Sequence, residues 1–184
     1  MYTFKTRTRS FIMVKKIAIA LLCMSLGSSL YARDISESEK FLGLEVAQTE
    51  LQADRFGEPD YDGDAVEFGF RIGAQTDEWR TMFVFDYYDS SDDDQNVEKG
   101  YLMVDYFFLK DENKFRPFIG VNVGYMNYES TLVEESGFLY GAQAGFVVNV
   151  METIDLDLSY RYLLSNADAL DHMGSIVFGI NYLY

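Results

Sequence analysis

The sequence predicts an all-β protein, an eight-stranded antiparallel up-and-down transmembrane β-barrel, and three observations lead to this prediction. Segments of about ten residues alternate apolar residues with small or polar ones, as strands with two different faces do. The connections between these segments alternate strictly between long and short. An export signal precedes them, and no stretch after Ala32 is apolar enough to form a transmembrane helix.

The N-terminal region has the composition of a secretory signal peptide. Lys15 and Lys16 precede an apolar run over residues 17–26, and small residues follow up to Ala32. The apolar run is shorter than the roughly 20 residues of a membrane-spanning helix, which disfavours an N-terminal anchor. The residues before Met13 fit no part of the signal pattern, so we expect translation to start at Met13.

Three segments follow from this interpretation. Residues 1–32 are the N-terminal extension plus signal peptide, residues 33–40 a short periplasmic leader, and residues 41–184 the barrel. The removed segment contains five basic and no acidic residues, so 10 of the 15 basic residues remain against 30 acidic ones, a formal charge of −20. Nucleic acid is excluded as a partner because phosphate binding requires a basic surface. The single cysteine, Cys23, lies in the signal peptide, which excludes disulfides from the barrel.

Each predicted strand has one wholly apolar face. In residues 66–73 the even-numbered positions are apolar, whereas the odd-numbered ones are Glu67, Gly69, Arg71 and Gly73. The apolar face suits lipid, and the small or polar face suits the crowded interior of a barrel. The predicted strands are 41–51, 65–75, 79–88, 99–109, 115–127, 137–149, 154–163 and 175–184.

The predicted connections carry a second signal. A membrane meander has tight turns on the periplasmic side and longer loops outside, and an even strand number places both termini in the periplasm. In lipid every backbone N–H and C=O must be paired within the protein, which requires a closed barrel. The short connections are 76–78, 110–114 and 151–154, and the long ones are 52–64, 89–98, 128–136 and 164–174.

Aromatic residues lie toward the strand ends on the apolar faces, where amphipathic rings prefer the membrane–water boundary. The predicted girdle residues are Trp79, Tyr87, Tyr125, Tyr140, Tyr162, Tyr182 and Tyr184. The chain ends on the outward series Ile176, Phe178, Ile180, Tyr182 and Tyr184. This end resembles the C-terminal sorting signal of bacterial outer-membrane barrels. The resemblance implies the barrel assembly machinery as a partner during biogenesis.

The stretches RPFIGVNVGY (116–125), GFLYGAQAGF (137–146) and LSYRY (158–162) resemble the OmpA/OmpX-type outer-membrane β-barrel family. The resemblance covers essentially all of the mature chain and implies the fold more strongly than an activity. The family's larger members carry a periplasmic peptidoglycan-binding domain after the barrel. We expect the barrel domain only in this chain.

Charges of both signs fall on the inward faces of the predicted strands. Buried charges are tolerated only when they are paired and hydrogen-bonded. We expect Arg71 to reach Glu45 on one neighbouring strand and Asp86 on the other. Such a network forms either a static polar plug or a salt-bridge gate in a narrow pore. The candidate network residues are Glu45, Glu67, Arg71, Arg80, Asp86, Asp105, Asp157 and Arg161.

The long connections are rich in carboxylates, including the run Asp92–Asp94. The stretch DYDGDAVE (60–67) suggests calcium, but its glycine follows the second aspartate and Arg71 occupies the closing glutamate position of an EF-hand. We therefore expect no cofactor and no specific metal site. The acidic loops would hold divalent cations weakly, bridging to lipopolysaccharide phosphates.

Some eight-stranded outer-membrane barrels modify lipid A with a histidine, a serine and an acid, for which this chain offers its one histidine, His172, with Ser175 and Asp171. A base must lie within hydrogen-bond reach of its nucleophile, and a spacing of three places two strand residues on opposite faces. We therefore predict no enzyme activity. The sequence favours a monomeric outer-membrane barrel with a structural or surface-interaction role, in adhesion or envelope integrity. A narrow ion-conducting pore is the alternative, and a lipid A-modifying enzyme comes third.

Overall fold

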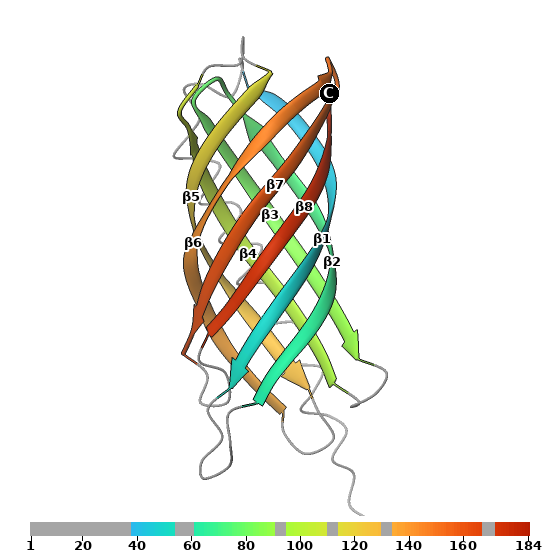
Figure 1. Ribbon diagram of the computed structural model, residues 1–184, viewed down its shortest axis with the longest axis vertical. Coiled ribbons are helices and arrows are strands. Elements are labelled where there is room, and N and C mark those ends of the chain that lie inside the picture. The colour runs from blue at the N-terminus through green and yellow to red at the C-terminus, as the bar shows by residue number, and fades with distance from the viewer. Residues whose placement is uncertain (1–37, 54–60, 91–94, 110–113, 130–133, 167–171) are drawn as a thin grey trace, which may run out of the picture. The chain divides into compact units, whose positions relative to one another are not determined.

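A computed structural model describes residues 38–184 except 54–60, 91–94, 110–113, 130–133 and 167–171. The unit from Glu39 to Tyr184 is a closed barrel of eight strands, each antiparallel to its neighbours (Figure 1). No helix in the described part of the chain is long and apolar enough to cross a membrane. The strands are β1 (Glu39–Ala53), β2 (Tyr61–Gln75), β3 (Trp79–Ser90), β4 (Gln95–Phe107), β5 (Phe115–Glu129), β6 (Glu134–Met151), β7 (Ile154–Ser165) and β8 (His172–Leu183).

The barrel closes between its first and last strands. β1 pairs with β8 from Phe41 opposite Leu183 to Gln52 opposite His172. The backbone N–H of Tyr184 donates to the Lys40 carbonyl at 2.9 Å, which ties the last residue into the sheet. The predicted eight-stranded up-and-down barrel is therefore confirmed. We call the end that carries the C-terminus the turn end, and the opposite end, where the connections after β1, β3, β5 and β7 lie, the hairpin end (Figure 1).

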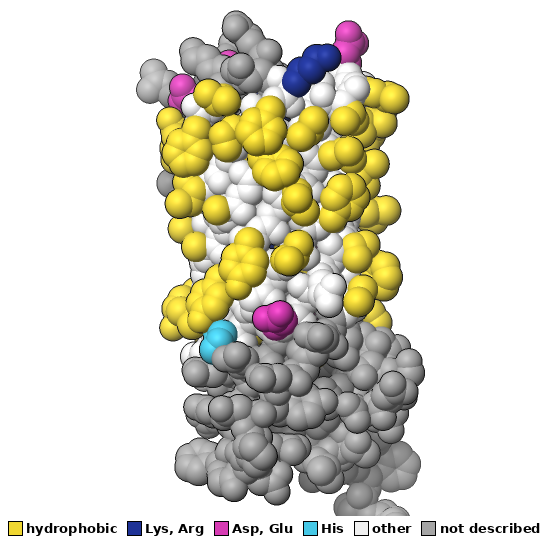
Figure 2. Space-filling view, viewed as in Figure 1, with side chains coloured by type: hydrophobic (Ala, Val, Ile, Leu, Met, Phe, Trp, Pro, Cys, Tyr) yellow, Lys and Arg dark blue, Asp and Glu magenta, His cyan; other side chains and the backbone are white. Residues whose placement is uncertain are grey.

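Burial alternates residue by residue along the strands, as the period-two pattern predicts. In β8, for example, Met173, Ser175 and Val177 are buried, whereas Ile176 and Phe178 are exposed. The exposed apolar side chains form a belt around the outside of the barrel (Figure 2). Such a belt is the surface that lipid covers in a transmembrane barrel. All the predicted girdle residues lie exposed on this outer face: Trp79, Tyr87, Tyr125, Tyr140, Tyr162, Tyr182 and Tyr184.

The predicted strand lengths were wrong at the hairpin end. Residues 52–53, 61–64, 89–90, 95–98, 128–129, 134–136, 164–165 and 172–174 belong to strands, although the sequence assigned them to long connections. At the turn end, β1 begins at Glu39, inside the predicted leader, and β4 ends at Phe107 rather than at residue 109. The connection after β4 spans 108–114, longer than 91–94 after β3, so connection lengths do not alternate strictly. Several of the added stretches, such as YDGD at 61–64 and EES at 134–136, are polar, so they lack the apolar alternation that lipid contact imposes on a strand.

Small residues let neighbouring strands approach closely inside the barrel. A Cβ at Gly141 would lie only 3.0 Å from the carbonyl carbon of Tyr162 and 3.1 Å from the Cα of Leu163. Both atoms belong to the backbone of β7 and cannot rotate away. The inward glycines on the predicted strands therefore serve packing.

Gly141→Ala is expected to lower the free energy of unfolding by about 1–3 kcal/mol, because the added methyl overpacks the interior. The matched control is Gly100→Ala, where the nearest atom to an added Cβ is a ring carbon of Phe83 at 3.4 Å, an ordinary contact. Gly100→Ala should change stability by less than about 0.5 kcal/mol. Urea unfolding in lipid vesicles measures both variants, and equal stabilities would contradict the packing argument.

Candidate functional site

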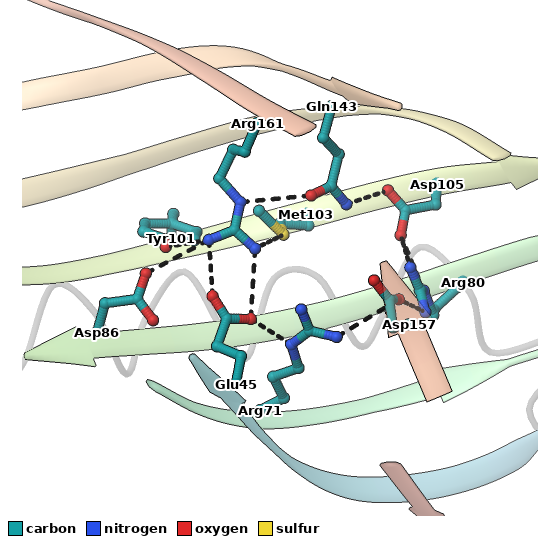
Figure 3. A network of polar contacts seen from close by, with 10 residues as sticks. All are labelled: Glu45, Arg71, Arg80, Asp86, Tyr101, Met103, Asp105, Gln143, Asp157 and Arg161. Atoms are coloured by element: carbon teal, nitrogen blue, oxygen red, sulfur yellow. Dashed lines mark hydrogen bonds and ion pairs between the residues drawn. The ribbon is translucent and has the colours of Figure 1, made fainter. Parts of the chain in front are cut away.

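The interior of the barrel holds a concentration of buried charged side chains. Every residue of the predicted network is at most 2% exposed: Glu45, Glu67, Arg71, Arg80, Asp86, Asp105, Asp157 and Arg161. These side chains come from β1, β2, β3, β4 and β7. Each points into the barrel because the side chains of a strand alternate between its two faces. Figure 3 shows how most of them meet across the lumen.

Arg161 on β7 is the most connected of these side chains. Its Nη1 donates to Glu45 Oε1 on β1 at 2.7 Å and to the Tyr101 hydroxyl on β4 at 2.5 Å, and it lies 3.4 Å from Asp86 Oδ2 on β3. Its Nε donates to Gln143 Oε1 on the adjacent β6 at 3.3 Å. The planar guanidinium has five N–H donors in fixed directions, which lets one side chain bind several strands at once.

Arg71 on β2 forms the second centre. It pairs with Glu45, as predicted, and its Nη1 lies 3.4 Å from Asp157 Oδ2 on β7, across the lumen. The predicted contact with Asp86 was wrong, since Asp86 faces Arg161 instead. A Cβ at Gly179 would clash with the Arg71 guanidinium, so the glycine leaves the space that this crossing requires.

Arg80 on β3 completes the network. Its Nε donates to Asp105 Oδ2 at 2.8 Å and its Nη1 to Asp157 Oδ2 at 2.6 Å. Its guanidinium lies 4.6 Å from the ring centroid of Phe118, within the range of a cation–π contact. Gln143 Nε2 donates to Asp105 Oδ1 at 2.7 Å, and the same side chain accepts from Arg161. The polar contacts therefore form a closed circuit (Figure 3). Glu45 links Arg161 to Arg71, Asp157 links Arg71 to Arg80, and Asp105 with Gln143 links Arg80 back to Arg161. Asp86 joins this circuit through Arg161.

Two interior cations were missed from the sequence. Lys99 on β4 donates from Nζ to Glu67 at 2.6 Å, and Arg116 on β5 lies 3.4 Å from Asp155 Oδ2. Both are fully buried. The alternation of faces along a strand could have identified them, because residues two positions apart point the same way. Lys99 lies two residues before inward Tyr101, and Arg116 lies two residues before inward Phe118.

With these cations, the described interior holds six carboxylates and five basic groups. Nearly equal numbers of the two signs leave little net field along the lumen. The interior therefore does not have the single-sign charge lining that favours selective ion passage.

Apolar side chains pack beside the ionic network. One cluster, toward the turn end, contains Phe107, Phe118 and Val147. A larger cluster includes Met126, Leu139, Leu163 and Met173, inward residues of β5 to β8 on the hairpin side of Arg161. All of these side chains are buried. The interior is thus filled by packed side chains, as expected for a barrel of eight strands.

The residues considered for catalysis do not meet. His172 starts β8 on the outer face, with its ring 5.4 Å from that of Tyr162. Ser175 is buried on the inner face, where its hydroxyl hydrogen-bonds Thr49 at 2.7 Å. The third candidate, Asp171, lies outside the described residues. This arrangement does not provide a base within reach of a serine nucleophile.

The suggested metal-binding stretch also differs from the expectation. Residues 61–67 of DYDGDAVE form part of β2, and an extended strand does not wrap around a cation as an EF-hand loop does. Asp60 and the run 92–94 lie outside the described residues. Among the residues that the structure describes, no group of three histidine, cysteine or acidic side chains is arranged to hold a metal ion.

These features define a class of protein: a small transmembrane β-barrel with an apolar outer belt and an ion-paired interior. Comparison of the sequence with protein-family models and with curated proteins finds no match. Solved structures with the same fold do match. Several of them are eight-stranded outer-membrane barrels of the OmpA/OmpX type, the fold that the sequence resemblance implied.

Neisserial surface protein A superimposes with a TM-score of 0.65 at 14% identity, over 79% of this chain and 97% of that one. Outer membrane protein H (OprH) from Pseudomonas aeruginosa gives 0.57 at 20% identity, over 79% and 99%. The N-terminal β-barrel domain of P. aeruginosa OprF gives 0.56 at 15% identity, over 79% and 99%. The chain therefore has the fold of a bacterial outer-membrane β-barrel.

Proposed function

We propose that this protein is a monomeric, non-conducting barrel of the bacterial outer membrane. Its role is structural or surface-interacting, in envelope integrity or adhesion through its acidic hairpins, with no catalytic activity and no cofactor. The observation that carries this proposal is the filled interior, in which ion pairs link strands on opposite sides of the lumen. A barrel closed in this way offers its outer surface and its hairpins for function.

The proposed orientation places both termini in the periplasm and the hairpin end outside the cell. It is supported by the polar sequences at the ends of the strands there, such as residues 61–64 and 134–136, since outer-membrane barrels have their longer, polar connections outside. The partners in this proposal are outer-membrane lipid and lipopolysaccharide, with divalent cations held weakly at acidic hairpins. The barrel assembly machinery would read the terminal series Ile176, Phe178, Ile180, Tyr182 and Tyr184, whose side chains all lie exposed on the outer face.

Conductance in planar lipid bilayers tests the closed interior. We expect no steady ion current from the purified, folded protein, because the central guanidinium and carboxylate groups are already paired with one another. Steady single-channel currents from the wild-type protein would contradict the proposal. They would establish the second candidate function, a narrow ion-conducting channel in which the ion pairs act as a gate.

One observation favours that second candidate. Several buried polar atoms in the lumen, including both amide atoms of Asn122 and the hydroxyl of Ser159, have no hydrogen-bond partner within the protein. Buried polar groups are normally satisfied by protein or by ordered water, so these groups favour some hydration of the lumen. Isolated waters do not conduct ions unless the ion pairs between them open.

A further inference from the structure

The apolar belt contains a groove on its outer face. At most belt positions the outward side chain is large, but Ala142 and Ala144 on β6 and Gly174 on β8 are small. Next to Ala144 lies a shallow surface hollow of about 270 Å³ that is largely open to the outside. It is lined by Ala144, Gly145, Phe146, Leu158, Ser159, Tyr160 and Ile176. Because the outward side chains here are hydrocarbon or aromatic, the groove suits a flexible apolar chain.

Polar aromatic rings lie beside this groove toward the hairpin end. Register partners on β6, β7 and β8 form rows across the outer face. One row consists of Ala144, Tyr160 and Ile176, and the next row toward the hairpin end consists of Ala142, Tyr162 and Gly174. The Tyr162 ring packs on that of His172, with centroids 5.4 Å apart and planes at 37°. The Tyr160 hydroxyl lies over Gly174, which has no side chain to displace it. We call Tyr160, Tyr162 and His172 the ring shelf.

Along the strands, an apolar groove is followed by a more polar ring shelf, as the acyl chain of a lipid is followed by its polar head. Tyr160 lies in the row of the groove and its hydroxyl reaches toward Gly174. Tyr162 and His172 lie two and four residues further along the strands, roughly 7–13 Å at the rise of a β-strand. This separation suits a lipid whose acyl chain lies in the belt and whose head lies at the membrane boundary.

The chemistry of the shelf favours a sugar head. The faces of aromatic rings carry partial negative charge, and the C–H groups of a sugar ring pack against them. Glu50, exposed on β1, is the register partner of Gly174. Its carboxylate can accept hydrogen bonds from sugar hydroxyls, whereas it repels a phosphate that no cation neutralises.

We propose that the groove and the ring shelf bind one glycolipid of the outer leaflet, with an acyl chain in the groove and a sugar ring on the shelf. This inference rests on the proposed function in one respect, the orientation that places the hairpin end outside. It does not depend on whether the lumen conducts, so failure of the conductance test leaves it standing.

Native mass spectrometry of the protein released from phosphocholine micelles tests the site. The micelles contain equal amounts of monogalactosyl diacylglycerol and phosphatidylglycerol with identical acyl chains. We expect the protein to retain one glycolipid in preference to the phospholipid. If ring stacking contributes about 1 kcal/mol, Tyr162→Leu should reduce that preference about fivefold. Ala144→Phe fills the groove and should reduce the retention of both lipids.

The matched control is Ala74→Phe, the same enlargement on the outer face of β2, which pairs with β1 and β3 and not with the strands of the groove. It should retain lipid as the wild-type does, and cold dodecyl sulfate electrophoresis verifies that each variant is folded. Equal retention of the two lipids by the wild-type protein would overturn the sugar assignment. Retention unaffected by Ala144→Phe would overturn the groove as the site, and a dimer mass that Ala144→Phe abolishes would replace the lipid with a second copy.

Discussion

Arg161→Met is expected to lower the free energy of unfolding by about 3–5 kcal/mol, the usual cost of removing one partner from a buried ion pair. Methionine fills much of the volume of the arginine stem but leaves Glu45 and Asp86 without their shared cation. The lost contacts also connect β7 to β1, β3 and β4, so the effect is on the closed barrel as a whole.

Equilibrium unfolding in urea with lipid vesicles measures this effect, provided that the slope against urea concentration is unchanged. The double variant Arg161→Met with Asp86→Asn should recover part of the loss, because Asp86 loses its cation with Arg161, whereas Glu45 keeps its ion pair with Arg71. Lys40→Met, at an exposed position, is the control and should stay within about 0.5 kcal/mol of the wild-type protein. A small loss for Arg161→Met would mean that water enters the lumen and solvates the carboxylates.

Val121→Arg should cost about 2–4 kcal/mol, the penalty for arginine on the lipid face near the bilayer midplane. Val121 is 63% exposed on β5 and pairs with Val104 and Ala142, outward residues of the neighbouring strands. The same exposure on a soluble protein would make the substitution nearly neutral. The prediction therefore separates a surface covered by lipid from one covered by water.

The matched substitution is Thr153→Arg, in the exposed turn between β6 and β7. There the guanidinium reaches water, and stability should change by less than about 0.5 kcal/mol. Both variants are compared with the wild-type protein by the same urea unfolding in vesicles. Equal and small effects at the two positions would mean that Val121 does not face lipid.

If both predictions hold, the two surfaces of the barrel contribute to stability by different means. The outer surface is stable because lipid covers its apolar side chains. The interior is stable because each central carboxylate meets a cation, as Asp105 and Asp157 meet Arg80.

The extent of the strands was predicted well only where lipid constrains the sequence. Within the belt, alternate residues must be apolar, so positions such as Phe68 and Phe70 identify both the strand and its outer face. Beyond the belt the requirement disappears. The extensions of β2 and β4 at residues 61–64 and 95–98 therefore could not be distinguished from loops, because the sheet hydrogen bonds that hold them are made by the backbone.

The sequence by itself determined the fold class and the face of each residue. Period-two alternation requires only the local geometry of a strand, and it placed Glu45, Arg71 and Arg161 together inside the barrel. Only the tertiary structure decided which of them pair. Arg71 meets Asp157 rather than Asp86 because closure brings β2 and β7 across one lumen, at heights set by the register of every strand between them. The groove beside Ala144 was likewise decided by register, which places side chains from β6, β7 and β8 next to one another.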